Sequence, residues 1–363
     1  MLIENSIVNT VSVSKQGLQK FVFDILMASA AATADAQIVA EALVWSDLRG
    51  RHAQGVARLP IFIKRLQRGL IFSPAAMNWK ALAPAIYLLD AGHGFGHVAG
   101  RIAMTKAVEL AKGNGIGLVT VKHSNLYGSA SYYCALASAA DCIGFTCTNA
   151  VAKVAPYGGT RPVLGTNPLA FGSPTSSGVP ILIDLSTSAI AGSSARDAGN
   201  NGNLLPEGVA LDANGNPTRD PIAAGNGCLL PGGSKGFALG LMVEILSGVL
   251  TGAALGREVG SIYNTWDKPV NTGHVFIAIH IERLLPLNVF LSRVDQLLDW
   301  ISSTPKQENV DEIRFPGQIR ARYAEEYSRS GIPLPQQTAL DLENLAQRLG
   351  LETPWKAQSN NHC

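Results

Sequence analysis

The sequence has no long uninterrupted apolar run and no excess of charge of either sign. Its 29 basic and 27 acidic residues give a formal net charge of +2, which provides no case for a nucleic-acid or membrane surface. No apolar segment reaches the roughly 20 residues needed to cross a bilayer. The N-terminal residues lack the apolar core of a secretory signal. We therefore expect a cytoplasmic protein that binds neither nucleic acid nor membrane.

Cysteine is also scarce. The five cysteines are odd in number and form no C-x-x-C pair, so a zinc site is not expected and no metal ligand is assigned. Cys142 and Cys147 lie in apolar surroundings and are predicted to be reduced core residues. The composition, with 47% hydrophobic and 15% charged residues, is that of a globular enzyme. A chain of 363 residues exceeds the usual size of one hydrophobic core, so two lobes are predicted.

The stretch 148–188 carries the strongest local signals. Glycine and Asn-Pro turns surround a short apolar run, residues 180–183, which is predicted to be a buried strand ending at Asp184. Ser186, Thr187 and Ser188 follow at once. These polar side chains fit a polar ligand, or alternatively the N-cap of a following helix.

Residues 49–55 form a polar hinge before a predicted amphipathic helix at 59–69. Lys64, Arg65 and Arg68 are expected to lie on the solvated face of this helix. Arg58 differs because it stands beside the hinge, where a guanidinium could bind a carboxylate in bidentate fashion.

Two glycine-rich segments suggest nucleotide binding. Residues 90–100 lie between predicted strands at 85–89 and 117–121, but the spacing is poor for a dinucleotide fingerprint. Lys122 and His123, rather than an acid, follow the second strand. A glycine-rich turn is therefore favoured there. Residues 232–236, GGSKG, open an apolar helix and present backbone N–H groups and Lys235 to a phosphate. An ordinary helix start with a surface lysine is the alternative.

Several long motifs in the same order identify a resemblance to the malate/L-lactate dehydrogenase type 2 family, which includes ureidoglycolate and sulfolactate dehydrogenases, 2,3-diketogulonate reductase and piperideine/pyrroline-2-carboxylate reductases. The matching pieces are DLRGRHAQGVARLP, GNGIGLVTVKHSNLYGSASYY, APYGGTRPVLGTNPLAF, ILIDLSTS, LLPEGVALDANGNPTRDP, LLPGGSKG, NTGHVFIAI and RFPG. They cover nearly the whole chain.

The resemblance implies an α+β fold with a non-Rossmann mixed-sheet cofactor domain and a discontinuous, mainly helical domain built from both ends of the chain. We place the NAD(P)-binding domain at residues 81–284 and the dimerisation and substrate domain at 1–80 and 285–363. The resemblance also implies a homodimer that uses NAD or NADP. Its substrates are small 2-hydroxy, 2-oxo or imino carboxylic acids.

Site residues are implied where the motifs match. Arg58 falls on the family's arginine for the substrate carboxylate. The family's cofactor contacts fall on Ala150, Asp184, Leu185, Ser186, Ser234, Lys235, Arg314, Phe315 and Pro316.

This chain departs from the family at two histidines. The S-H-G-x-x-R motif is AQGVAR here, with Gln54 for histidine, and S-N-H-F-G is SNLYG, with Leu126 for the histidine often named as the acid/base. Glutamine has no proton to give at neutral pH, and leucine offers neither donor nor acceptor. Ketone reduction needs a proton on the nascent alkoxide, and a positioned acid typically contributes about 100- to 10,000-fold.

Three interpretations remain. His52, His123 or Tyr127 could supply the proton to a 2-oxo acid while Gln54 orients the carbonyl, which makes the protein a malate/lactate-type oxidoreductase. Alternatively, the substrate is a cyclic or N-alkyl 2-imino acid, whose protonated ketimine accepts hydride without needing a further proton. In the third interpretation, the chain binds the cofactor but is catalytically impaired.

Overall fold

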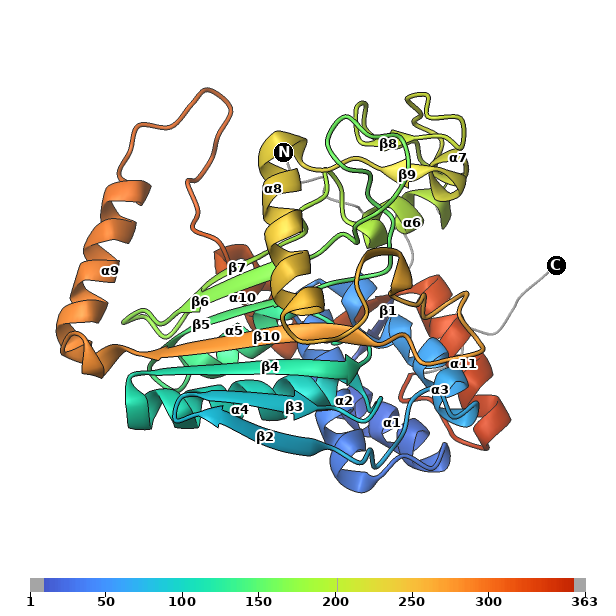
Figure 1. Ribbon diagram of the computed structural model, residues 1–363, viewed down its shortest axis with the longest axis horizontal. Coiled ribbons are helices and arrows are strands. Elements are labelled where there is room, and N and C mark those ends of the chain that lie inside the picture. Colours follow the sequence, from blue (N-terminus) through green and yellow to red (C-terminus); the bar gives the residue numbers. More distant parts are fainter. Residues whose placement is uncertain (1–9, 201, 356–363) are drawn as a thin grey trace. The chain divides into compact units, whose positions relative to one another are not determined.

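The computed structural model describes residues 10–200 and 202–355 (Figure 1). The chain divides into two compact units: a helical unit, Met1–Gly69 with Arg320–Cys363, and a sheet unit, Leu70–Ile319. The boundaries predicted from the sequence, 80/81 and 284/285, differ from this division. Strand β2 (Asn78–Ala83) pairs with β3 (Ile86–Asp90), and Pro316 bonds to a strand of the sheet, so both segments join the sheet unit.

The helical unit is built around two antiparallel helices and a small ribbon from the two ends of the chain. Its elements are β1 (Thr10–Val13), α1 (Lys15–Ala28), α2 (Thr33–Asp47), α3 (Leu59–Gln67), α10 (Gln318–Ser330), β11 (Ile332–Pro335) and α11 (Gln336–Leu349). Helix α1 begins at Ser14, whose side chain accepts a hydrogen bond from Gly17 N, and it buries Leu18, Ile25 and Leu26 at helical spacing. Strand β1 pairs with β11, so the discontinuous unit is held together by backbone hydrogen bonds.

Arg65 corrects one prediction. Lys64 and Arg68 are exposed as expected, but Arg65 is 0% exposed. Arg65 follows the buried Phe62 by three residues and therefore lies on the flank of the apolar face of α3 rather than on its solvated face.

The sheet unit contains a mixed sheet of seven strands in the order β2-β3-β4-β10-β5-β6-β7. The remaining strands are β4 (Ile116–Ser124), β5 (Cys142–Thr148), β6 (Leu169–Ser173), β7 (Ile181–Leu185) and β10 (Thr272–His280). Only β3 and β4 pair in parallel; every other neighbouring pair is antiparallel. A doubly wound nucleotide fold has a mostly parallel sheet, so the prediction of a non-Rossmann mixed sheet is confirmed.

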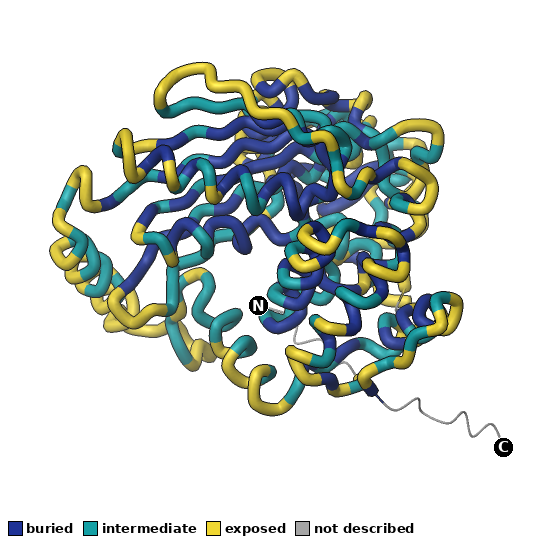
Figure 2. Tube along the Cα trace, turned by 90° about the horizontal axis from the view of Figure 1, so that it is seen from below, coloured by how far each residue is buried: buried dark blue, intermediate teal, exposed yellow. Residues whose placement is uncertain are grey.

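Helices cover both faces of this sheet (Figure 1). Helices α4 (Gly96–Asn114) and α5 (Ala130–Ser138) pack on one face, and α8 (Gly233–Glu244) with the π-helical turn Ile245–Val249 packs on the other. Figure 2 shows that the inner strands are buried along most of their length. The remaining elements are α6 (Gly192–Asn200), β8 (Ala210–Leu211), α7 (Pro221–Asn226), β9 (Cys228–Leu229) and α9 (Leu287–Ser302). In the described part of the chain, no helix is long and apolar enough to cross a membrane.

The strand directions bring distant parts of the sequence to one edge. Strand β10 runs antiparallel to both β4 and β5, so β3, β4, β5 and β7 all point the same way. They end at Asp90, Ser124, Thr148 and Leu185. We call this side of the sheet the carboxyl edge.

Helix α5 packs so close to the sheet that the strand positions in contact with it must be glycine. A Cβ built on Gly144 would lie 2.7 Å from Ala137 Cβ and 3.1 Å from Cys134 Cα. The Gly144→Val variant should therefore lower the free energy of unfolding by about 1–3 kcal/mol through overpacking, although valine favours strands. Urea denaturation measures this change.

Gly113→Ala is the matched control for this variant. A Cβ on Gly113, on the exposed side of α4, would meet no atom within 4 Å. That variant should be neutral or more stable by about 0.5–1 kcal/mol. Equal stability of the Gly144→Val protein and the wild type would contradict the close packing of α5.

Candidate active site

The buried carboxylate of Asp47 organises the predicted substrate segment in the helical unit. Asp47 ends α2, and two short 3₁₀ turns follow, His52–Gln54 and Val56–Arg58. One carboxylate oxygen lies 2.9 Å from His52 Nδ1, and the other accepts a hydrogen bond from Val56 N at 2.7 Å. A Cβ on Gly55 would lie 2.0 Å from this carboxylate, so only glycine fits there. Burial raises the pKa of Asp47, although the contacts with His52 and Val56 N oppose this.

The same two turns carry Gln54 and Arg58. Arg58 is 7% exposed, and its Nε donates to Ala53 O at 2.7 Å, which fixes the guanidinium against its own turn. Gln54 Oε1 is buried and has no hydrogen-bond partner among the described residues. An unsatisfied buried amide oxygen is expected to meet a ligand or a water. His52, Gln54 and Arg58 thus form one compact segment.

In the sheet unit, Asp184 reaches across to the start of α5. Its Oδ2 accepts hydrogen bonds from Ser131 N at 2.9 Å and from Ser131 Oγ at 2.6 Å. Ser131 is the second residue of α5, where backbone N–H groups lack intrahelical partners and the helix dipole favours a negative charge. Asp184 therefore caps α5, which precedes it in the chain, whereas the N-cap interpretation predicted a helix that follows it.

Backbone hydrogen bonds hold the segment after Asp184 beside the start of α8. Thr187 O accepts from Gly232 N at 2.9 Å, and Thr187 N donates to Thr166 O at 3.0 Å. Ser234 and Lys235, in the first turn of α8, are exposed. A Cβ on Gly233 (φ +65°) would meet no atom within 4 Å, so the space above this helix start is open. Open N–H donors and a cation suit an anionic phosphate.

The carboxylate of Glu244 fixes the loop that carries Ala150. Glu244 is 4% exposed and accepts hydrogen bonds from Asn149 Nδ2, Asn167 Nδ2 and Gly256 N at 3.2, 2.7 and 2.8 Å. Asn167 Oδ1 in turn accepts from Ala150 N at 3.2 Å. The predicted cofactor position at Ala150 is thereby tied to Asn167, and Thr166 next to it is tied to Thr187.

The segment 314–316 lies along the outer edge of β7. Leu182 N donates to Pro316 O at 3.0 Å, two residues before Asp184. Arg314 is exposed and pairs with Glu312 at 3.0 Å. Every predicted cofactor segment therefore lies in the sheet unit. Residues 184–186 are at the end of β7, Ser234 and Lys235 at the start of α8, and residues 314–316 beside Leu182 of β7.

Two of the candidate proton donors also lie in the sheet unit. His123 stands near the end of β4 with Nδ1 3.0 Å from both carboxylate oxygens of Asp90. Tyr127 is 1% exposed and its ring stacks on that of His274 at a centroid distance of 4.5 Å. Burial raises the pKa of Tyr127 well above its usual value.

His274 is an organising residue that the sequence analysis did not single out. Its Nδ1 lies 2.7 Å from Thr148 Oγ1 and its Nε2 lies 2.8 Å from Ser124 Oγ. It therefore bridges the ends of β5 and β4. Burial lowers the pKa of His274 to about 3, so the ring is neutral. The sequence signal that could have identified His274 was the motif NTGHVFIAI, which contains it.

Other supporting residues had weaker signals. Ser131, Glu244 and Asn149 act through partners about 50 to 105 residues away, and no local pattern marks such pairs. Among the described residues, no group of three or more His, Cys, Asp or Glu side chains could hold a metal ion.

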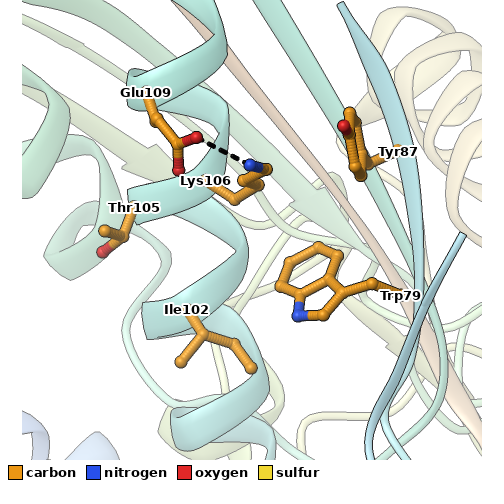
Figure 3. A pocket seen from close by; sticks show the side chains of 6 residues that line it. All are labelled: Trp79, Tyr87, Ile102, Thr105, Lys106 and Glu109. Carbon is orange, nitrogen blue, oxygen red and sulfur yellow. Dashed lines mark hydrogen bonds and ion pairs between the residues drawn. The ribbon is translucent and has the colours of Figure 1, made fainter. Parts of the chain in front are cut away.

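A surface cleft of about 490 Å³ lies elsewhere on the sheet unit, between β2, β3 and α4 (Figure 3). Trp79 and Tyr87 face Lys106, whose ammonium lies 4.9 Å from the Tyr87 ring centroid and 2.7 Å from Glu109. None of the predicted site residues lines this cleft.

Sequence comparison decides the family. The malate/L-lactate dehydrogenase family profile matches residues 13–343. The chain belongs to the malate/L-lactate dehydrogenase family. It is 36% identical over 353 residues to a malate dehydrogenase from Pyrococcus abyssi, covering 95% of this chain and 96% of the relative. The resemblance drawn from the motifs is confirmed.

Solved structures agree with this assignment. Malate dehydrogenase from Entamoeba histolytica is 30% identical, with a TM-score of 0.91, and the match covers 95% of this chain and 100% of that one. Delta1-piperideine-2-carboxylate reductase from Pseudomonas syringae pvar. tomato is 28% identical, with a TM-score of 0.83, over 92% of this chain and 99% of that one. The predicted fold class is thereby confirmed.

Both cofactors occur in the names of similar dehydrogenases of this family. A ureidoglycolate dehydrogenase (NAD(+)) from Escherichia coli O157:H7 is 29% identical over 84% of this chain and 87% of the relative. A (2R)-3-sulfolactate dehydrogenase (NADP(+)) from Chromohalobacter salexigens is 31% identical over 86% of this chain and 91% of the relative. The chain is an NAD(P)-dependent oxidoreductase of the malate/L-lactate dehydrogenase family, as predicted.

Proposed function

We propose that this enzyme transfers hydride between NAD(P)H and a small 2-oxo or 2-hydroxy carboxylic acid. The observation that supports this most directly is the gathering of the predicted cofactor segments around the end of β7 and the start of α8. Residues 184–186 lead directly into Thr187, whose carbonyl oxygen accepts a hydrogen bond from Gly232 N at the start of α8. The relatives named malate and sulfolactate dehydrogenases support acids of this class.

The cofactor, when bound, supplies or accepts the hydride, and the protein's residues hold it. The open start of α8, with Ser234 and Lys235, has donors and a positive charge suited to the cofactor's phosphates. Residues 184–186 are suited to a ribose hydroxyl because a carboxylate and a serine hydroxyl accept hydrogen bonds. Ala150, Leu185 and residues 314–316 would form the rest of the cofactor's surroundings.

Arg58 would hold the substrate carboxylate. Its guanidinium has the planar fork geometry that binds a carboxylate with two hydrogen bonds. Burial to 7% exposure strengthens such a contact because water competes less. Gln54, in the same segment, would orient the reacting group: its Nε2 can donate to a carbonyl oxygen, and its buried Oε1, which has no partner among the described residues, can accept from the N–H of a protonated imine.

Reduction of cyclic or N-alkyl 2-imino acids is the alternative function. Gln54 and Leu126 replace the two histidines, and a protonated ketimine needs no further proton after hydride addition. The likeness to delta1-piperideine-2-carboxylate reductase also favours this alternative. A cofactor-binding protein without turnover is the remaining interpretation, and Arg58 argues against it because such a protein needs no carboxylate clamp.

We also propose that the enzyme is a homodimer, and its cytoplasmic location stays a prediction from the sequence. Apolar side chains on the outward faces of α8 and α9, and on the turn after α8, are at least 38% exposed in the single chain. They are Leu239, Leu241, Met242, Ile245, Val249, Leu250, Val289, Leu297, Trp300 and Ile301. Extended exposed apolar surface of this kind marks a protein–protein interface.

A substrate panel tests the function. Oxidation of NADH and of NADPH is followed with pyruvate, oxaloacetate and other 2-oxo acids, and in parallel with cyclic imino acids and with pyruvate plus methylamine. We expect turnover of at least one 2-oxo acid. Turnover of imines alone would support the reduction of 2-imino acids instead. Cofactor binding without any turnover would favour a catalytically impaired protein.

The Arg58→Ala variant should raise KM for the acid by about 100-fold, because a charge-assisted bidentate contact contributes about 1.5–3 kcal/mol. Cofactor affinity, measured by NADH or NADPH fluorescence titration, should not change. Arg68→Ala, at an exposed position after the same helix, is the control. Unchanged kinetics of the Arg58→Ala variant would show that Arg58 does not hold the substrate carboxylate.

The oligomeric state can be measured by sedimentation velocity. We expect a mass of two chains, and Leu250→Asp with Trp300→Asp should shift the protein to one chain by placing charge in the buried interface. Ile222→Asp, at a 73% exposed position on α7, is the control. A monomeric wild type would refute the dimer.

A further inference from the structure

Asp90 and His123 form a carboxylate–imidazole pair that no motif predicted. The two residues come from neighbouring parallel strands, with Asp90 opposite Lys122 in the register. His123 Nδ1 lies 3.0 Å from each carboxylate oxygen. The imidazole side chain is 34% exposed, and its ring centroid lies 5.0 Å from that of His93.

The backbone around this pair is held in an unfavourable conformation. His93 and His123 both have left-handed φ values, +58° and +51°, which are uncommon for residues other than glycine, although histidine adopts them more often than most. A hydrogen bond from His93 N to His123 O at 2.6 Å joins them, and Asn125 Nδ2 donates to His93 O at 3.0 Å. Such strain persists where the surroundings enforce it, and it concentrates at functional sites.

The carboxylate fixes which ring nitrogen of His123 carries a proton in the neutral form. Because Asp90 accepts at Nδ1, Nδ1 is the donor and Nε2 is left for another partner. This is the arrangement by which a carboxylate orients a histidine for proton transfer.

Lys122 shares the carboxylate with His123, since Lys122 Nζ lies 3.8 Å from Asp90 Oδ2. Within the described sheet unit, the charged and titratable groups around the imidazole are Asp90, Lys122 and His93. Burial raises the pKa of Asp90, but hydrogen bonds from Gly92 N and His123 and the charges of His123 and Lys122 outweigh it, so the pKa is lowered. Burial and the charge of His123 lower the pKa of His93, although the charge of Asp90 opposes this.

The pair lies at the carboxyl edge of the sheet, on β3 and β4, with β10, β5 and β6 between it and β7. Asp90 and Ser124 end strands at the carboxyl edge, the side of the sheet at which Thr148 and Leu185 also end. His123 precedes by three residues the half-buried Leu126, which replaces the family's histidine. The other carboxylate–imidazole pair, Asp47 with His52, lies in the helical unit. In both pairs the carboxylate also accepts a backbone hydrogen bond, from Val56 N at Asp47 and from Gly92 N at Asp90.

We propose that His123 is the proton donor of this enzyme and that Asp90 is its positioning residue. The inference rests on the proposed function and deepens it. The carbonyl carbon of the 2-oxo acid receives two electrons as a hydride from NAD(P)H, the C=O π bond breaks, and the oxygen takes the proton from His123 Nε2. The neutral His123 then regains a proton from water. In the reverse direction, neutral His123 accepts the hydroxyl proton of the 2-hydroxy acid.

His123→Asn is the direct test, because asparagine tolerates the left-handed backbone of this position. We expect kcat/KM for the 2-oxo acid to fall at least about 100-fold, with KM and cofactor affinity little changed. Any reduction of a cyclic imino acid by the same variant should change little, since a protonated ketimine brings its own proton. A structural role would lower both activities equally.

Asp90→Asn keeps the shape of the side chain and removes its charge. We expect kcat/KM for the 2-oxo acid to fall while KM changes little, because an amide no longer fixes the proton of the neutral ring on Nδ1. Independently of activity, the ¹⁵N chemical shifts of the neutral His123 ring should show a proton on Nδ1 in the wild type and a mixture of tautomers in the variant. A wild type without the Nδ1–H tautomer would refute the role of Asp90.

His52→Asn is the control that separates the two histidine pairs. Loss of 2-oxo acid reduction in His52→Asn but not in His123→Asn would overturn the inference and leave the proposed function intact. A wild-type enzyme that reduces imino acids alone would overturn both.

Discussion

The pairing of β10 with two strands at once is the constraint on which the rest of the sheet unit depends. Because β10 runs antiparallel to β4 on one side and to β5 on the other, both neighbours point the same way. The strands β3, β4, β5 and β7 therefore end together, although they are separated by up to about one hundred residues of chain. Polar residues lie at or just beyond the end of each strand. The sheet topology therefore brings together residues that no local sequence pattern connects.

Three carboxylates hold turns and helix starts within the two units: Asp47 and Glu244 are buried, and Asp184 is half-buried. Asp47 holds the turn of the substrate segment, Asp184 the start of α5, and Glu244 the two asparagines beside Ala150. A buried carboxylate is unfavourable unless hydrogen bonds replace its water, and each of these has backbone or amide N–H donors. The loops are consequently held in one conformation, which a site for a dinucleotide and a small acid requires.

The replacement of two family histidines changes how the proton can move without changing the framework. Leu126 leaves the turn after β4 intact, and Tyr127 fills the core against His274. The nearby pair Asp90 and His123 supplies acid–base chemistry from the same edge of the sheet. The scaffold thus separates the residues that shape the site from those that carry out proton transfer, and the second group can vary.

The sequence by itself determined the family, the helical and strand segments around the motifs, and the residues matched to cofactor and carboxylate. These follow from local patterns such as GGSKG at a helix start and ILIDLSTS at a strand end. Only the tertiary structure decided that Asp184 caps α5, that Arg65 is buried, and that Asp90 meets His123. Those contacts join residues 33 and 53 positions apart or depend on which face of a helix is covered. Such facts arise from strand pairing and packing, and no local pattern of residues records them.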